Sequence, residues 1–513
     1  MATTLTFKSK IDVPEWRTLA QAPAYSSSQP YLISDYRPDS YANPYIYYIL
    51  TSASFHRYNT KTDGWGVLPS PTLASHYAGS NGVMMPQWGP RGTIAAGATT
   101  TSIPLTTALN ATVGINQLAN KGDGTGYRIR VLGNAAGSSG LVEERLVVGN
   151  TSGTTPTITL DSALSFTPIA GDGYEILSGR VYLLAGLNNG ANSWKYYDIA
   201  TDSFVAVANY PVSTNADSVL VGLDEGYVDP SKLPGQGFFG TLVATASTGT
   251  TLTGQAAGGD AGVTANRYRN FQIRVVQDVA IPTAVGQRRN ITSHTAGASP
   301  VYTVPVWAVT PSAAASYVIE NNGDRVLMWG TPDTNTNTYS ISGNAWDTVT
   351  FGVKGGTNAG GAWGCHSFAI TPDSANNVNR GMIYVGRGGT DSTVDVLDIT
   401  AATTGTWSNS ITYSGLGGGI ASGTTSCGIY DPVSNSGKYF YMCGSSQTQN
   451  FYRFDVLNRH LEPWAIMRYP APANGQNGLR MGFSSFVDGA TKIGLIYFIR
   501  ANSNEWFQIL ASV

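Results

Sequence analysis

Residues 180–211 read RVYLLAGLNNGANSWKYYDIATDSFVAVANYP, and this stretch contains one complete unit of the fold. The apolar run from Val181 to Leu184 suits a strand that is buried on both faces. Gly186 follows it and permits a sharp turn with positive φ. The next strand, Trp194 to Asp198, alternates along its length, which is typical of one buried and one solvated face. A third strand carries Phe204, so the unit predicts three antiparallel strands joined by tight turns.

The same order of features recurs along the chain. Each copy has an apolar strand, a loop, a strand with an aromatic residue and usually an Asp, and then a strand with one large aromatic residue. The copies cover residues 45–69, 180–211, 324–351, 381–410 and 437–467, with an incomplete sixth copy at 492–510. The aromatic residues of the last strands are Trp65, Phe204, Trp346, Trp407 and Trp464. A repeat of this length indicates a repeat architecture.

This pattern resembles the kelch family of β-propellers, in which an apolar strand ends in Gly and is followed by Tyr-Asp and Trp-bearing strands. The resemblance implies an all-β fold, a six-bladed kelch-like propeller. Kelch copies usually carry a Gly-Gly pair, and here only Gly388-Gly389 comes near it. The sixth copy lacks a Trp-bearing strand, and the N-terminal segment from Val13 to Leu19 supplies one. We therefore expect a strand from the N-terminus to close the sixth blade, which leaves no open blade.

Two long gaps between the copies contain related sequences. Both open with Gly-Thr and a Thr-rich stretch, continue with an alternating strand (YRIRV from 127, FQIRV from 271), and then carry a Gly turn and an arginine-bearing strand. We expect two homologous inserted β-barrel or sandwich domains at 91–177 and 239–321. The propeller then comprises residues 1–90, 178–238 and 322–513. Both insertions leave equivalent loops of adjacent blades, so we expect them on the same face.

The inserted domains also resemble segments of tailed-bacteriophage virion proteins. There a phrase recurs that joins an arginine-bearing strand, Asn-Thr, a Thr-rich strand, a Pro loop and Gly-Asp-x-Tyr-Glu-Ile. The first domain matches at Arg145, at Asn150-Thr151, at Pro168 and at residues 171–176, GDGYEI. The second domain lacks the Gly-Asp and the Glu. The resemblance implies a structural virion protein of the tail, neck (nozzle) or baseplate.

The composition narrows the classes of partner. Charged residues make up 12% of the chain and the formal net charge is −2, so a basic face for specific nucleic-acid binding is not expected. A surface poor in charge resembles an interface, although β-rich proteins are often low in charge for other reasons. No apolar run is long enough to span a membrane, and the N-terminus shows no signal peptide. The expected partners are other virion proteins, in a symmetric homo-oligomer within the particle.

The residues that carry catalytic chemistry do not form a recognisable set. The five histidines are dispersed, without a metal-binding pair, and the three cysteines have no CxxC spacing. No nucleophile elbow, P-loop or dinucleotide fingerprint is present. We expect no enzyme activity, no catalytic residue, no cofactor and no metal. A hydrolase or copper oxidase on a propeller is the weakest alternative.

The main alternative is a glycan-binding propeller that recognises a host surface. Its candidate contacts are Trp65 and Trp464, which could stack on sugar rings, and Asp224, which lies in a loop before the second inserted domain. The tryptophans recur once per copy, and aromatic residues that recur in a propeller usually pack between blades. We therefore expect packing for these residues.

Overall fold

The computed structural model describes the chain in 21 segments. They are residues 17–23, 31–34, 44–73, 81–109, 113–185, 193–211, 218–223, 241–255, 265–320, 323–330, 333–357, 363–366, 382–387, 393–412, 427–431, 438–443, 450–456, 460–466, 480–488, 491–499 and 505–511. Within them the protein is all-β, and the helical elements are two single 3₁₀ turns, Gln117–Ala119 and Pro282–Ala284. None of the described helices is long and apolar enough to cross a bilayer.

Six of the sheets in the described segments have four antiparallel strands. Sheet I comprises β2 (Tyr31–Ile33), β3 (Tyr45–Thr51), β4 (Ser54–Asn59) and β5 (Gly64–Val67). Sheet II comprises β6 (Asn81–Met85), β13 (Arg180–Leu184), β14 (Trp194–Asp198) and β15 (Ser203–Ala206). Sheet III comprises β16 (Val219–Leu223), β24 (Arg325–Trp329), β25 (Asn335–Ser340) and β26 (Ala345–Val353).

The other three sheets follow in the C-terminal part of the chain. Sheet IV comprises β27 (Trp363–His366), β28 (Met382–Gly386), β29 (Thr393–Asp398) and β30 (Thr406–Thr412). Sheet V comprises β31 (Cys427–Asp431), β32 (Tyr439–Cys443), β33 (Asn450–Asp455) and β34 (His460–Ile466). Sheet VI comprises β35 (Arg480–Asp488), β36 (Thr491–Ile499), β37 (Trp506–Leu510) and β1 (Arg17–Thr18).

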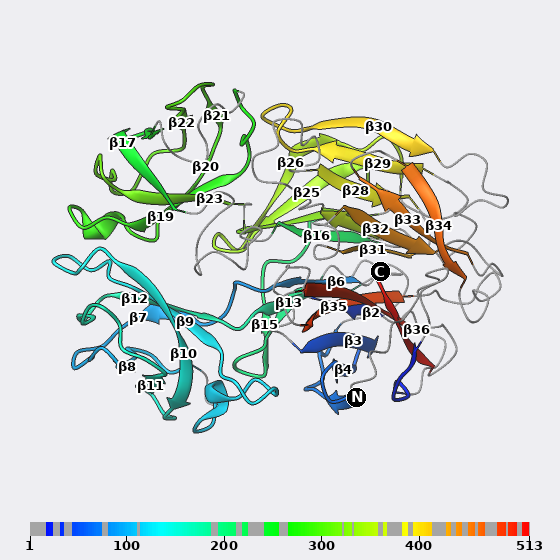
Figure 1. The fold of residues 1–513 in the computed structure, drawn as a ribbon, viewed down its shortest axis with the longest axis horizontal. Coiled ribbons are helices and arrows are strands. Elements are labelled where there is room, and N and C mark those ends of the chain that lie inside the picture. Colours follow the sequence, from blue (N-terminus) through cyan, green and yellow to red (C-terminus); the bar gives the residue numbers. More distant parts are fainter. Residues whose placement is uncertain are drawn as a thin grey trace, which may run out of the picture.

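The first strands of these sheets contact one another in a cycle. The contacts run from β2 to β6, β16, β27, β31 and β35, and β35 contacts β2 again. Glycines allow the close approach: a Cβ on Gly364 would lie 2.4 Å from Val219 Cγ1, and one on Gly482 would lie 2.9 Å from Ile46 Cγ2. The curvature of the assembly is propeller-like (Figure 1).

Sheet VI joins the two ends of the described chain. Arg17 pairs with Gln508 and Thr18 with Phe507. The amide of Leu19 donates to the carbonyl of Trp506 at 3.0 Å. The strand of N-terminal origin is thus the neighbour of β37, whereas Trp16 lies outside the described residues.

The large aromatic residues of the fourth strands pack on the preceding sheet. Ring centroids lie 5.3 Å apart for Trp65 and Trp506, 5.6 Å for Phe204 and Phe55, 5.4 Å for Trp346 and Trp194, and 5.6 Å for Trp407 and Trp329. Such tilted and edge-to-face pairs stabilise the contact beyond the area they bury. Aromatic packing therefore holds each of these sheets against its neighbour.

The alternation expected for β14 is not seen in its burial. Trp194, Tyr197 and Asp198 are all buried. The carboxylate of Asp198 is buried because Arg180 Nε lies 3.4 Å from it and the amide of Thr201 donates to it at 3.2 Å. A polar residue at the end of a strand can thus face the interior when its partners are supplied there.

Residues 91–177, here called the first module, form a six-stranded sheet. Its order is β7 (Arg91–Thr93), β12 (Gly173–Leu177), β9 (Arg128–Leu132), β10 (Val142–Asn150), β11 (Thr157–Leu160) and β8 (Ser102–Pro104). A bridge between Ile94 and Leu105 brings the two edges of this sheet together. The interior contains buried apolar side chains such as Ile129, Ile158 and Ile176.

The described parts of residues 239–321, the second module, form a seven-stranded sheet. Its strands follow the same circular order as those of the first module, but the circle is opened at a different place. The sheet comprises β20 (Arg288–Asn290), β19 (Gln272–Gln277), β23 (Ser316–Glu320), β17 (Leu242–Thr248), β18 (Thr251–Gly254), β22 (Val301–Thr303) and β21 (Ser293–His294). Strands β20 and β21 follow each other along the chain and together occupy the place of β10.

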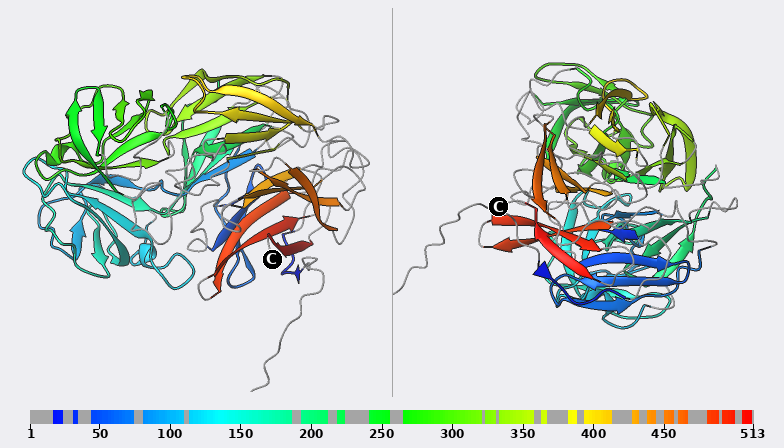
Figure 2. Two further views of the ribbon diagram at one scale, coloured as in Figure 1. Left: turned by 45° about the horizontal axis from the view of Figure 1, so that its top comes forward. Right: turned by 90° about the vertical axis from the view of Figure 1, so that its right-hand side faces the viewer.

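The two modules lie at equivalent positions in the order of strands along the chain. The first lies between β6 and β13, the first two strands of sheet II, and the second lies between β16 and β24, the first two strands of sheet III. The modules lie side by side, away from the four-stranded sheets, in both Figure 1 and Figure 2.

Candidate functional site

The first module is fixed to sheet I by the loop at residues 120–125. Asp123 accepts from Lys121 at 2.9 Å and from Lys61, which lies in the β4–β5 turn, at 3.1 Å. Its side chain is only 3% exposed. Burial by itself would raise the pKa of Asp123, but hydrogen bonds from Thr125, Lys121 and Lys61 hold that pKa well below its usual range. The buried carboxylate therefore ties the module to the turn of sheet I.

The second module is fixed to sheet IV in a comparable way. The side-chain amide of Asn270 donates to the carbonyls of Ile399 and Ala402, the latter at 3.2 Å. Arg269 Nη1 donates to the carbonyl of Ala401 at 3.1 Å. These acceptors lie in the β29–β30 turn, so each module rests on the turn between the third and fourth strands of a sheet.

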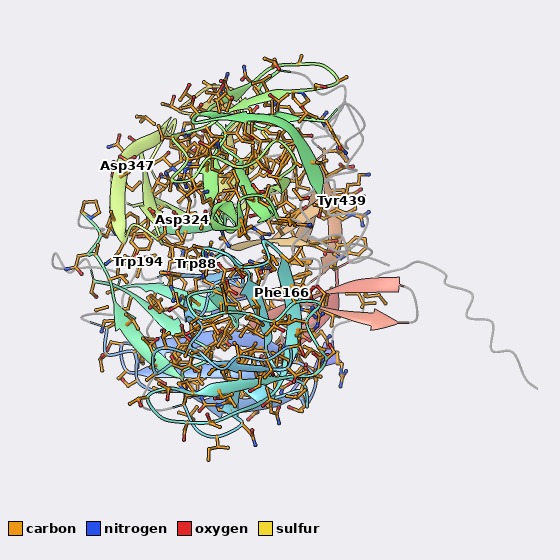
Figure 3. The ribbon with its side chains drawn as sticks, turned by 90° about the vertical axis from the view of Figure 1, so that its left-hand side faces the viewer. Trp88, Phe166, Trp194, Asp324, Asp347 and Tyr439 are labelled. Carbon is orange, nitrogen blue, oxygen red and sulfur yellow. The ribbon has the colours of Figure 1, made fainter. Side chains whose placement is uncertain are left out.

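Trp88 links the stems of both modules. It follows β6, and its indole N–H donates to the carbonyl of Gly323, where the chain returns from the second module, at 2.5 Å. The amide of Gly179, where the chain returns from the first module, donates to the Trp88 carbonyl at 2.6 Å. The Arg91 guanidinium lies 3.9 Å from the Trp88 ring centroid. Trp88 is buried near the boundary between the two modules (Figure 3).

The modules also contact each other through equivalent turns, β9–β10 and β19–β20. The amide of Asp278 donates to the carbonyl of Gly140 at 2.8 Å. The side-chain amide of Asn134 donates to the carbonyl of Val285 at 3.4 Å. The approach requires glycine at residue 140, because a Cβ there would lie 2.1 Å from the Asp278 carbonyl oxygen.

A cluster of charged side chains joins the modules beside this contact. Glu175 accepts from Arg91 at 2.8 Å and from Arg130 at 2.7 Å, both in the first module. Arg288 of the second module lies 3.4 Å from the same carboxylate. Burial alone would raise the pKa of Glu175, but Arg91, Arg288 and Arg130 together hold it well below its usual range. The carboxylate is therefore ionised and shared between the modules.

Four residues of the motif GDGYEI at residues 171–176 have structural roles. Gly171 has a φ of 94°, which favours glycine. The Asp172 carboxylate accepts from the amides of Ala135 and Ile169, each at 2.8 Å. Tyr174 packs over Gly92, and Glu175 is the centre of the charged cluster. Residues of this motif thus help to hold the module together.

A second shared feature supports the relation between the modules. Arg145 Nε donates to the carbonyl of Ala163 at 3.1 Å, and Arg289 Nε donates to the carbonyl of Val306 at 2.9 Å. Each arginine also donates through Nη1 to the carbonyl of the residue before it. The two arginines occupy equivalent places and brace equivalent loops.

The candidate glycan contacts are on separate sheets. Trp65 is half-buried; its indole N–H donates to the carbonyl of Ala20 at 3.3 Å, and its ring packs on Trp506. Trp464 is half-buried, and its ring lies under the Arg453 guanidinium at 4.0 Å. Asp224 lies outside the described residues. The two tryptophans therefore take part in packing.

The described histidines do not converge with other ligands. His56 bonds to the hydroxyl of Ser54 at 2.8 Å, and burial lowers its pKa. His294 accepts from the amide of Tyr268 at 2.9 Å and lies 2.9 Å from the carbonyl of Thr295. Among the residues with described positions, no three His, Cys, Asp or Glu side chains gather as metal ligands would.

Trp88, Arg91 and Arg288 were not predicted as joining residues. Trp88 lies outside every copy of the repeat, and this position was the feature of the sequence that indicated a separate role for it. Arg288 carried a subtler signal, because it adds a cation to the second module where the first has an acid.

Comparison with known proteins does not assign a family. No family model matches the chain, and no curated protein matches it either. Among solved structures, a chain from the crystal structure of a mitotic checkpoint complex is similar over 100% of this chain and 96% of its own length, with 10% sequence identity and a TM-score of 0.37. This similarity is too weak to carry an argument about function.

Proposed function

We propose that this protein is a structural component of a tailed-bacteriophage particle, placed in the tail, neck or baseplate. The observation that carries the proposal is the structural role of residues 171–176, the segment that resembles virion proteins. Asp172 is fully buried and Glu175 is nearly so. The Asp172 carboxylate accepts hydrogen bonds from loop amides, and the Glu175 carboxylate contacts Arg288 of the other module. Residues used in this way suit a scaffold whose task is to keep a shape.

The fold supports the same proposal. We interpret sheets I to VI as the blades of a six-bladed kelch-like propeller, closed by the N-terminal strand β1, with two homologous barrel domains inserted in adjacent blades. The cycle of contacts among the first strands and the pairing of β1 with β37 support this interpretation. Closure through both ends of the chain protects the edge of the last sheet.

The mechanism is assembly through preformed faces. The two modules are anchored at their stems, on the turns of sheets I and IV, and on each other. A surface that is already rigid loses little conformational entropy when it binds a neighbour, and symmetry multiplies each contact. We propose that neighbouring subunits of a homo-oligomer and other virion proteins are the partners.

The proposal is tested by fractionating a phage lysate. Particles are purified on a density gradient and washed in high salt, and the protein is quantified by mass spectrometry against a known capsid protein. A fixed ratio that survives the wash is expected for a virion component. Recovery of the protein only in the soluble fraction would contradict the proposal and favour the glycan-binding alternative.

A further inference from the structure

The two modules differ in charge at matched positions. In the first, Arg130 pairs across the sheet with Glu144 on one side and Glu175 on the other. In the second, the equivalent arginine is Arg274, and its cross-strand neighbours are Arg288 and Val318. At the position of Glu144 the second module thus has a base, Arg288. At the position of Glu175 it has an apolar residue, Val318.

The second module compensates for these changes within its own sheet. Glu320, two residues after Val318 on the same strand, takes both a 2.9 Å and a 3.1 Å contact from the Arg274 guanidinium. Residues two apart on a strand face the same side of the sheet. The Glu320 carboxylate therefore lies on the face of the second module's sheet that corresponds to the Glu175 face of the first. Across the contact between the modules, Arg288 Nη2 lies 3.4 Å from the Glu175 carboxylate.

The contact between the modules is close to reciprocal. Asn134 and Asp278 both lie where the turn begins, each four residues after the equivalent arginine, Arg130 or Arg274, although a register shift between Val275 and Gln277 offsets the second strand by one residue. The side-chain amide of Asn134 donates to the carbonyl of Val285, which precedes β20 in the second module. The backbone amide of Asp278 donates to the carbonyl of Gly140, which precedes β10 in the first module. Two such modules therefore meet as the halves of a two-fold contact do.

Reciprocity allows the alternative pairings to be compared. In a pair of first modules, Glu144 would take the place of Arg288 and face Glu175, acid against acid. In a pair of second modules, Arg288 would face Val318 and lose its carboxylate. In the unlike pair, Arg288 faces Glu175 at 3.4 Å with both side chains largely buried.

We propose that this exchange of charges is a specificity device, which makes the first module bind the second module of its own chain and disfavours contacts between like modules of neighbouring chains. Opposed like charges and unpaired buried charges are the usual means by which an interface rejects wrong partners. In a multi-copy assembly the device keeps the contact faces of the modules occupied internally. The inference concerns the chain's own assembly and goes beyond the proposed function.

The test uses the full-length protein and hydrogen–deuterium exchange at neutral pH. The Asp278 amide, which bonds across the contact to Gly140, is the reporter, together with residues 132–142. Arg288→Glu restores the acid of the first module and should raise exchange at the reporter by about tenfold or more, because it opposes Glu175. Glu175→Gln in the same chain removes the opposition and should restore most of the protection.

Arg128→Gln is the matched control. It also removes an arginine from the edge of this cluster, but its partner at 3.2 Å is Glu144 of the same module. Exchange at the Asp278 amide should stay within twofold of wild type, on the order expected for a surface pair. If Arg288→Glu leaves the reporter unchanged, or if Arg128→Gln opens it equally, the proposal is wrong.

A second readout separates specificity from simple loss of folding. Exchange within β19 and β23 reports on the second module itself, and it should not change in Arg288→Glu. If those strands lose protection together with the reporter, and Glu175→Gln does not restore it, Arg288 stabilises its own module and the proposal is overturned.

Discussion

The indole N–H of Trp88 donates to the carbonyl of Gly323 at 2.5 Å, although the two residues are 235 positions apart in the sequence. Trp88 precedes the first module and Gly323 follows the second. A single buried bond therefore connects the chain just before the first module to the chain just after the second. The stems of the two modules thus share this residue.

Replacement of Trp88 should loosen both modules together. Trp88→Phe removes the bond and leaves the Gly323 carbonyl without its donor, at an expected cost of about 1–3 kcal/mol. Trp88→Ala should cost about 3–5 kcal/mol because it also leaves a cavity. Thermal unfolding and amide exchange in residues 91–177 and 241–320 measure the effect.

Trp307→Phe is the control for the tryptophan substitutions. Trp307 is also buried, but its indole N–H has no hydrogen-bond partner among the described residues. We expect a smaller loss of stability than for Trp88→Phe. Equal losses would mean that the bond to Gly323 contributes nothing specific.

Removal of residues 1–20 should strongly destabilise the six-sheet body. The deletion removes β1, the bond from Leu19 to Trp506, and the Ala20 carbonyl that accepts from Trp65. It also exposes the edge of β37, which favours aggregation. A deletion of residues 1–10 is the control, and its midpoint of thermal unfolding should match wild type. An unchanged midpoint after the longer deletion would contradict closure by the N-terminal strand.

Acid should weaken the anchor between the first module and sheet I. The folded pKa of Asp123 lies below the unfolded value, so its ionised form stabilises the folded state above the unfolded pKa of about 3.9. That contribution is lost as the pH falls through the folded pKa. Asp123→Asn should therefore be less stable than wild type at pH 7, and the difference should shrink as the pH falls below about 4. A difference in unfolding midpoint that is constant from pH 7 to pH 3 would argue against this role.

Substitution of Trp65 distinguishes packing from glycan binding. Trp65→Ala removes a ring that packs on Tyr58 and on Trp506, and it should lower stability by about 3–5 kcal/mol. We expect no specific signal for the wild-type protein on a glycan array. Specific sugar binding by wild type, lost in a Trp65→Ala protein that folds normally, would favour the glycan-binding function.

Local pattern predicted much of the strand content, because apolar runs, turns and aromatic residues are read over short distances. The predicted aromatic residues Trp65, Phe204, Trp346, Trp407 and Trp464 lie on the fourth strands β5, β15, β26, β30 and β34. First strands such as β16 were not predicted. Strand β16 contains Gly222, and its partner β24 follows only after the second module.

The joining residues could not be predicted for a related reason. Glu175 was noted only as part of a phrase, and its roles depend on Arg91, Arg130 and Arg288, which are brought to it by three different strands. A sequence shows which residues carry charge but not which charges meet. The weak internal resemblance of the modules predicted two homologous β-domains, but it did not predict the order of their strands.

The central claim, that the protein is a fixed part of a phage particle, is tested most directly by immunogold labelling. An antibody to the purified protein is applied to intact particles from a lysate of the source. We predict gold at one defined place on the tail, neck or baseplate of most particles. Unlabelled particles, with all of the antigen in the soluble fraction, would contradict the account.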